Sequence, residues 1–402
     1  MNTPNKAKKP DFMIDTLAIK LKYPAFRIIN PNFFTPALII KEFIPTPEFQ
    51  YGRNRFAKYL QNPTPQDNKK GIYKPRLTAY QRFEENKPTY ELHIEFSAPK
   101  LLFGNSIQEL GKEDFGRTVR ALKQQLFLMG VETTEDSLHR AFVVKAHFGK
   151  NIPLPYPLTA QDAISGLYKA DLGKSKDINM REYRNGGQSL YFYASSYNII
   201  FYDKLRDIAT PKNRAVDKNK FKPEKTLLQK TSGDYQQEIL RFEVRLTKQQ
   251  SLNPFLSKAL GRDIKQITFE EVFNKSLCQK VLLKTWEEIV KTPANQLALK
   301  IENLPEEVFD ELIKNINPKQ RKKAHSLNTT LASFGLYVLI KNKGVRWTKS
   351  RIEKNWTNKS WGRLSIIIKN SANSLKIIPE LPTISNTQSA LEKFERYDWQ
   401  PR

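Results

Sequence analysis

A tyrosine at the end of an aromatic-rich stretch is the residue of this sequence best suited to covalent chemistry. Residues 190–202 alternate aromatic and β-branched side chains, as a buried or half-buried strand does. A carboxylate and an ammonium, those of Asp203 and Lys204, follow Tyr202 directly. A phenol held between such groups is well placed to attack phosphorus. The alternative interpretation is a packed aromatic ring whose hydroxyl is satisfied by Asp203.

Tyrosine has one advantage over water as the attacking group. A phosphotyrosine ester keeps the energy of the broken phosphodiester bond for later religation, whereas hydrolysis by water would lose it. The phenol pKa of about 10 means that its proton must leave before or during the attack. Lys204 is expected on the same side of an extended chain as Tyr202, where it could lower that cost or stabilise charge on the phosphate.

Three other predicted strands each carry a ligand-type side chain on the face opposite their apolar residues. These side chains are Glu95 on the strand at 89–96, His147 on the strand at 141–148 and Glu243 on the strand at 238–247. Two carboxylates and an imidazole suit Mg²⁺ or Mn²⁺. Such a metal would withdraw charge from a phosphodiester and orient it for in-line attack, so the three residues are predicted metal ligands.

Each predicted ligand also has a purely structural interpretation. A histidine on the polar face of a strand is usually solvated or hydrogen-bonded. The two glutamates could instead form cross-strand ion pairs with Arg241, Arg245 or Lys145. Further candidates for metal binding or support are His93, Lys145 and Asp203. The sequence does not show that the strands are neighbours.

A single sheet would have to position these residues, and the pattern of elements predicts one. The expected class is α+β, with an antiparallel sheet covered by helices on one face and followed by a mostly helical C-terminal domain. The spacing of apolar residues over 112–129 predicts one of the helices. The predicted division is a disordered basic arm at 1–12, a catalytic domain at 13–255 with a mobile insert near 207–231, a helical domain at 256–370 and a loosely ordered tail at 371–402.

The charge of the chain favours a polyanionic partner. Lys and Arg number 67 against 41 Asp and Glu, a net charge of +26, which suits nucleic acid first and an anionic membrane second. No apolar run approaches the ~18–20 residues that span a bilayer, so no membrane partner is expected. A single cysteine excludes an intrachain disulfide and a cysteine-cage metal site, and indicates a cytoplasmic setting. The basic residues predicted to contact DNA are Lys150, Arg245, Arg346, Lys349 and Arg351.

Several segments together resemble the phage and plasmid replication initiators related to the filamentous-phage gene II protein, the nickase that starts rolling-circle synthesis. The matching segments are MIDTLAIKL (13–21), IEFSAPKLLFGN (94–105), VVKAHFGKNIPL (143–154), SLYFYASSYNIIFYDKLRDI (189–208), LRFEVRL (240–246) and, more weakly, LASFGLYVLIKNKG (331–344). The pair FYDK and RFEVRL, in that order and roughly 40 residues apart, is the most specific part.

The resemblance implies a metal-dependent, site-specific single-strand endonuclease and strand transferase in a bacterial host cell. On that expectation Tyr202 attacks the origin phosphate, keeps the 5′ end as a phosphotyrosine and releases a 3′-hydroxyl for host polymerase and helicase. Glu95 and Glu243 fall on acidic positions of the family, and His147 falls where relatives carry aspartate or histidine. The chain lacks the His-hydrophobe-His motif of better-known rolling-circle nickases. Either the mixed set holds the metal, or His93 supplies the third ligand.

Two other classes of protein compete with the nickase. A non-catalytic, sequence-specific DNA-binding protein, such as a repressor or segregation factor, explains the charge but leaves the acidic residues without a role. A tyrosine recombinase needs arginine and histidine around a tyrosine late in the chain, and no metal. Metal-dependent nicking of supercoiled DNA separates the three classes. The alternative nucleophiles are Tyr197 and Tyr193, and the sequence leaves the oligomeric state open.

Overall fold

The computed structural model describes most of the chain between residues 11 and 397. The described ranges are 11–12, 14–35, 56–64, 66–67, 70–84, 87–172, 179–184, 189–193, 197–209, 238–315, 324–356 and 358–397. Ten residues of the predicted basic arm and residues 210–231 of the predicted insert lie outside them. Asp11–Phe12 are not part of a disordered arm, because they form strand β1, which pairs with β7 (Leu110–Gly111).

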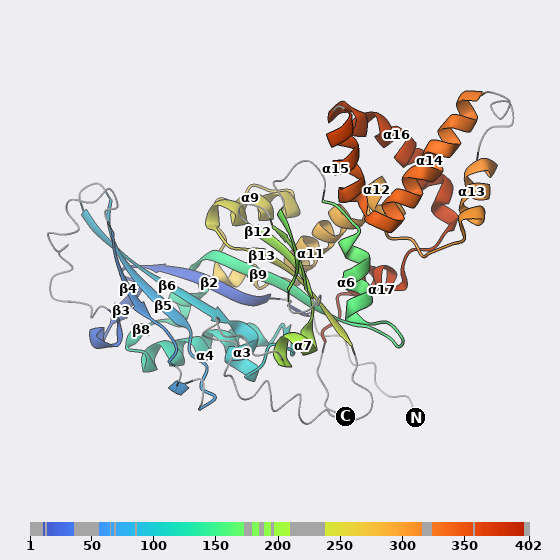
Figure 1. The fold of residues 1–402 in the computed structure, drawn as a ribbon. Helices are drawn as coiled ribbons and strands as arrows, with labels where there is room; N and C mark the ends of the chain where they lie inside the picture. The colour runs from blue at the N-terminus through green and yellow to red at the C-terminus, as the bar shows by residue number, and fades with distance from the viewer. Residues whose placement is uncertain are drawn as a thin grey trace, which may run out of the picture.

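A nine-stranded sheet is the centre of the fold (Figure 1), with the order β10-β11-β12-β13-β9-β2-β6-β5-β4. In that order the strands are Asn179–Arg184, Ser189–Tyr193, Tyr197–Asp203, Ile239–Leu246, Phe142–Pro153, Ile14–Lys22, Lys87–Ser97, Arg76–Glu84 and Phe56–Gln61. All the pairings are antiparallel. The strands that carry Tyr202 (β12), Glu243 (β13) and His147 (β9) are therefore consecutive neighbours. Strand β6, which carries Glu95, is separated from β9 by β2.

The period-two pattern of the strands gives the sheet one apolar face. Leu92, Ile94 and Phe96 of β6 are buried, and Ile94 and Phe96 pair with Ile19 and Leu17 of β2. Helices cover this face and share one hydrophobic core with it. These helices are α4 (Asp114–Leu128), α5 (Glu135–His139), α6 (Ala160–Tyr168), α9 (Gln249–Leu260), α10 (Phe269–Val272), α11 (Lys275–Val290) and α17 (Pro382–Lys393). The predicted α+β class is confirmed.

A second hydrophobic cluster holds the remaining C-terminal helices together. They are α12 (Pro293–Ala298), α13 (Pro305–Lys314), α14 (Ala324–Lys343), α15 (Val345–Asn355) and α16 (Asn358–Ser374). Residue 255 does not mark a boundary between two hydrophobic cores, because α9, α10 and α11 belong to the same core as the sheet. The domain boundaries therefore stay a prediction. No helix in the described ranges has the length and hydropathy of a membrane span.

Two predictions about local structure are wrong. The stretch 190–202 is not one strand but a hairpin of β11 and β12, in which Ser189 pairs with Tyr202. Its middle reads Ala-Ser-Ser, which lacks the β-branched and aromatic side chains that favour strands. The tail at 371–402 is not loosely ordered over its described part, because α17 and Phe394 are buried in the core of the sheet.

Candidate active site

Tyr202 lies near the end of β12 on the polar face of the sheet. Its neighbour Phe201 points to the opposite face, where its ring stacks on Phe242, with the two ring centroids 4.7 Å apart. Tyr202 is only 5% exposed, and its hydroxyl donates a hydrogen bond to Oε1 of Glu243 at 2.8 Å. The proposed role of Asp203 as the partner of this hydroxyl is therefore wrong.

Glu243 is held by two arginines as well as by the tyrosine. Its Oε1 accepts from Nε of Arg241 at 3.1 Å, and its Oε2 accepts from Nε of Arg245 at 2.7 Å. The carboxylate is buried, so each of these charge-assisted bonds replaces lost hydration. The ion pairs of Glu243 with Arg241 and Arg245 are present, but they lie within β13 and do not connect two strands as the structural interpretation predicted.

The environment of Tyr202 keeps its phenol protonated. Burial raises the pKa of Tyr202 well above 10, and the negative charge of Glu243 raises this pKa further, while the charges of Arg241 and Arg245 oppose the rise. The phenol cannot reach its anionic form by simple ionisation near neutral pH. A reaction through it needs a proton acceptor within hydrogen-bond distance, and Glu243 is such an acceptor.

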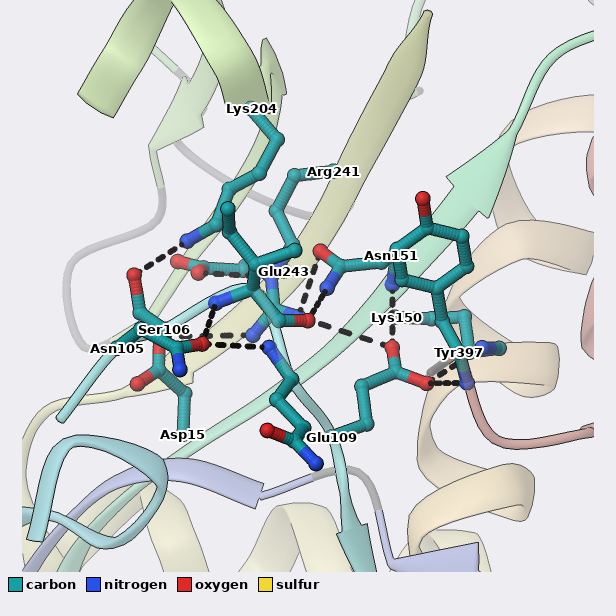
Figure 2. A network of polar contacts seen from close by, with 12 residues as sticks. Asp15, Asn105, Ser106, Glu109, Lys150, Asn151, Lys204, Arg241, Glu243 and Tyr397 are labelled. Atoms are coloured by element: carbon teal, nitrogen blue, oxygen red, sulfur yellow. Dashed lines mark hydrogen bonds and ion pairs between the residues drawn. The ribbon is translucent and has the colours of Figure 1, made fainter. Parts of the chain in front are cut away.

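A buried polar network holds Arg241 from behind (Figure 2). Its Nη1 donates to Oδ1 of Asn151 at 3.1 Å and lies 3.9 Å from Glu109, and its Nη2 lies 3.5 Å from Asp15. The guanidinium also lies across Gly149 of β9, where an added Cβ would come within 2.7 Å of its Cζ. Arg241 is thus fixed on several sides, and it fixes Glu243 in turn.

Glu109 connects this network to the C-terminal end of the described chain. It accepts from the backbone N–H of Asn151 at 2.6 Å, from Nζ of Lys150 at 2.7 Å and from the backbone N–H of Tyr397 at 2.8 Å. The predicted contact of Lys150 with DNA is wrong, because this side chain is 2% exposed and its charge is neutralised by Glu109.

A polar pocket of about 120 Å³ opens beside Tyr202. It brings together five of the residues predicted from the sequence: Tyr202, Lys204, Glu95, His147 and Arg245. The lining of the pocket carries three cations, Lys100, Lys204 and Arg245, and three carboxylates, Asp15, Glu95 and Asp207. Such a concave polar site with a buried tyrosine suits a small anionic group such as a phosphate.

Lys204 lines the pocket, but the backbone that places it there is helical and not extended as the sequence predicted. It is the first residue of α7 (Lys204–Ala209) rather than part of an extended chain. Its Nζ donates to Oγ of Ser106 at 2.9 Å and lies 5.9 Å from the centre of the Tyr202 ring. Asp203 starts this helix, since its Oδ1 accepts from the backbone N–H groups of Leu205 and Arg206 at 3.0 Å each.

The predicted metal ligands do not form a metal site in this arrangement. Glu95 pairs with Nζ of Lys145 at 2.6 Å, and the oxygens of Glu243 are engaged by two guanidinium groups and a phenol. Among the described residues, no three or more His, Cys, Asp or Glu side chains are grouped so that they could hold a metal ion. Glu95 and His147 line the pocket, whereas Glu243 lies behind it.

The alternative third ligand lies elsewhere on the sheet. Nε2 of His93 is 3.5 Å from a carboxylate oxygen of Glu91, and its ring lies 4.7 Å from that of Tyr80. It does not line the pocket beside Tyr202. The structure therefore does not bring His93 together with Glu95 and His147.

Comparison with known proteins gives one family match. Residues 76–259 match the model of a family described as the N-terminal part of the gene II replication-associated protein. This match supports the resemblance to gene II-type replication initiators. The match runs from β5 into α9 and includes Glu95, His147, Tyr202 and Glu243. No curated protein and no solved structure matches the chain.

Several residues of the candidate site were missed in the sequence. Asp15, Lys100 and Ser106 line the pocket, and Arg241 and Glu109 stand behind it. Asp15 was detectable in the sequence, because the apolar residues before and after it do not keep the alternation of a regular strand. In the structure the strand register shifts at this point. Glu109 and Tyr397 had none, since they are 288 residues apart in the chain.

The C-terminal residues predicted to contact DNA lie on α15 and differ in accessibility. Arg346 and Arg351 are exposed, and the Arg351 guanidinium lies 5.9 Å from the ring centre of Trp347. Lys349 is half-buried, with Nζ 3.9 Å from a carboxylate oxygen of Asp171. Arg346 and Arg351 are the better placed of the three to reach a phosphate backbone.

Proposed function

We propose that this gene II-type initiator nicks one DNA strand at a replication origin with Tyr202 as the nucleophile, and later rejoins that strand. The observation that carries the proposal is the 2.8 Å hydrogen bond from the Tyr202 hydroxyl to Glu243, beside a polar pocket that cations help to line. It pairs a nucleophile with a base that is itself oriented by Arg241 and Arg245.

The proposed step conserves atoms and charge. The Tyr202 oxygen attacks the phosphorus, and its proton passes to Glu243. The bond between phosphorus and the 3′-oxygen breaks, the leaving 3′-oxygen takes one proton from solvent water to become the 3′-hydroxyl, and Glu243 releases its proton to solvent. The 5′ end remains on the enzyme as a phosphotyrosine. Because no water is consumed, the reverse reaction reseals the strand.

Cations of the pocket would stabilise the charge on the reacting phosphate. Lys100, Lys204 and Arg245 line the space next to Tyr202, and the first two side chains are almost fully buried. Charges fixed in a site of low dielectric act strongly and need no reorganisation during the reaction.

We also propose, from the family resemblance, that Mg²⁺ or Mn²⁺ assists the reaction by withdrawing charge from the phosphate. The described side chains do not offer a formed site for such an ion, so the steps above use only groups of the chain. The proposed partners, in the bacterial cytoplasm, are origin DNA, single-stranded or supercoiled, a host polymerase that extends the free 3′-hydroxyl, and a host helicase.

The test is covalent capture of labelled DNA. The protein is incubated with a labelled single-stranded origin library and Mn²⁺, and adducts are detected on a denaturing gel. Tyr202→Phe should abolish the adducts and leave DNA binding intact, because Glu243 keeps both arginine partners. Tyr197→Phe, on the same strand, is the matched control and should keep them. Wild-type adduct levels in Tyr202→Phe would contradict the proposal, and a non-catalytic DNA-binding protein would give none in any variant.

A further inference from the structure

A second hollow lies away from the candidate active site, between the C-terminal half of α4 and the small strand pair of β3 (Phe26–Ile28) and β8 (Val131–Thr133). Its volume is about 700 Å³, in the range of ligand-binding clefts. Three cations line it: Arg27, Arg120 and Lys123. All three are exposed, and the acidic side chain that lines the hollow with them is Glu132. The hollow therefore carries a net positive charge.

An exposed aromatic ring accompanies these cations. Phe127 lines the hollow and is 60% exposed, although it lies on a helix whose apolar face packs in the core. Arg120, Lys123 and Phe127 are three and four residues apart, so they share one side of α4. An apolar ring left in water among cations suits a ligand that offers both negative charge and flat apolar surface.

Within the described ranges the cations are weakly engaged. Lys123 has one carboxylate at 3.9 Å, that of Glu135, and both side chains are about half exposed, so the pair contributes little. Neither Arg27 nor Arg120 has a described acidic side chain within ion-pair distance. Their charges are thus available to phosphates, unlike that of Lys150, which is neutralised inside the protein.

We propose that Arg27, Arg120, Lys123 and Phe127, named here the α4 track, bind a single-stranded segment of DNA. The cations would contact successive phosphates, and an unpaired base would stack on Phe127. A duplex fits less well, because its bases already stack on one another and leave no face for the ring.

The position of the α4 track suggests which strand it takes. In Figure 1 α4 lies between the β3–β8 pair and α3 (Ala98–Phe103), and α3 carries Lys100 of the active-site pocket. With 15 residues, α4 is about 22 Å long. A strand leaving the pocket could follow α4 to the hollow. The inference thus deepens the proposed function, since the track would hold a flank of the strand that Tyr202 attacks.

The test measures binding without chemistry, in full-length Tyr202→Phe protein. The probe is a fluorescein-labelled oligothymidylate of about 20 nucleotides, followed by fluorescence anisotropy at several salt concentrations. Replacing Arg27, Arg120 and Lys123 together by alanine should raise Kd about tenfold or more. It should also reduce the steepness of the salt dependence by about two, since each lost phosphate contact removes about 0.7 from the slope for single strands.

Two matched controls decide the result. Alanine at Arg262, Lys265 and Lys280, three other exposed cations, removes the same charge and should leave the salt slope unchanged. Phe127→Ala should raise Kd for the single strand about tenfold without changing its salt slope, and should leave duplex binding unaltered. Tyr156→Ala, which removes another exposed ring, should have no effect.

Equal losses in the two triple variants would overturn the inference, since general charge would then explain binding. Unchanged binding in Phe127→Ala would overturn it as well, because no base would stack there. Either failure leaves covalent capture by wild-type protein untouched, so it is distinguishable from a failure of the proposed nicking activity.

Discussion

The phenol of Tyr202 is a weak acid, and its surroundings make it a weaker one. Burial and the charge of Glu243 both raise its pKa, and two arginines only partly offset them. Alkaline solution therefore cannot supply the phenolate below about pH 10, and the rate of adduct formation in the wild-type protein should be flat from about pH 7 to about pH 9. In the proposed mechanism, proton transfer along the hydrogen bond to Glu243 takes the place of ionisation by solvent.

Glu243→Gln should reverse that pH behaviour. The substitution removes a charge that raises the pKa of Tyr202 and leaves Arg241 and Arg245, which lower it, so this pKa falls. Near pH 7 adduct formation should slow by about 10²- to 10⁴-fold, because the base is lost. The rate should then rise with pH as phenolate forms. Single-turnover rates from about pH 7 to about pH 9.5 check this, with thermal unfolding as the control for folding. A variant at wild-type speed near pH 7 would exclude Glu243 as the proton acceptor.

The close approach of Arg241 to Gly149 gives a second residue-level prediction. A Cβ at position 149 would come within 2.7 Å of the Arg241 Cζ, and Asn151 and Glu243 restrain the guanidinium from moving. Gly149→Ala should therefore lower the free energy of unfolding by about 1–3 kcal/mol and slow adduct formation.

Gly335→Ala is the matched control for that variant. An added Cβ at position 335 meets no atom within 4 Å, and the residue lies within helix α14. The substitution should stabilise the protein by about 0.5–1 kcal/mol and leave adduct formation unchanged. Thermal unfolding and adduct assays measure both effects. Equal behaviour of the two variants would show that Arg241 does not depend on the space above Gly149.

At the scale of elements, the sequence predicted which segments form strands and on which face of the sheet their residues lie. It did not predict which strands are neighbours. Alternation in LRFEVRL placed Phe242 and Val244 on the core face and Glu243 on the other, and both are confirmed. Pairing of β13 with β9 and β12 depends on contacts between distant segments, which no local pattern encodes. The same limit hid the contact of Glu243 with Tyr202, whereas Arg241 and Arg245, each two residues away, were recognised as alternative partners.

The C-terminal segment is a further element that local patterns did not reveal. The backbone N–H of Tyr397 donates to Glu109, and Arg396 lies 3.5 Å from Glu113. Tyr397 also packs with Leu205 and Ile208 of α7, the helix that follows Tyr202. Burial and the nearby Glu109 carboxylate raise the pKa of Tyr397 to about 12. The end of the described chain thus supports the wall behind the active site.

Truncation after Phe394 should therefore impair the active site, whereas truncation after Tyr397 should not. The shorter protein loses the hydrogen bond from the backbone of Tyr397 to the Glu109 carboxylate, which keeps Lys150; the loss of a bond to a charged group costs about 1–3 kcal/mol of stability, and adduct formation should fall about tenfold. The longer one keeps every described contact of Glu109 and is the matched control. Thermal unfolding and adduct rates compare the two. Identical rates would show that residues 395–397 do not position the site.

At the scale of the whole molecule, the family resemblance predicts a metal-dependent reaction, whereas the described side chains are not grouped to hold a metal ion. The resemblance predicts that adducts disappear in EDTA and return when Mg²⁺ or Mn²⁺ is added in excess. DNA binding measured in the same buffers should not change, because it depends on basic residues. Full adduct formation in EDTA would contradict the metal requirement. Lys100, Lys204 and Arg245 would then be the cations that stabilise the reacting phosphate.

The most direct measurement is the location of the covalent bond. Wild-type protein is allowed to react with single-stranded origin DNA, the adduct is digested with nuclease and protease, and the remaining nucleotide is mapped by mass spectrometry. The expected product is a phosphorylated 5′ end joined to the peptide that contains Tyr202. A nucleotide on Tyr193 or Tyr197, or cleaved DNA without any attached peptide, would contradict it.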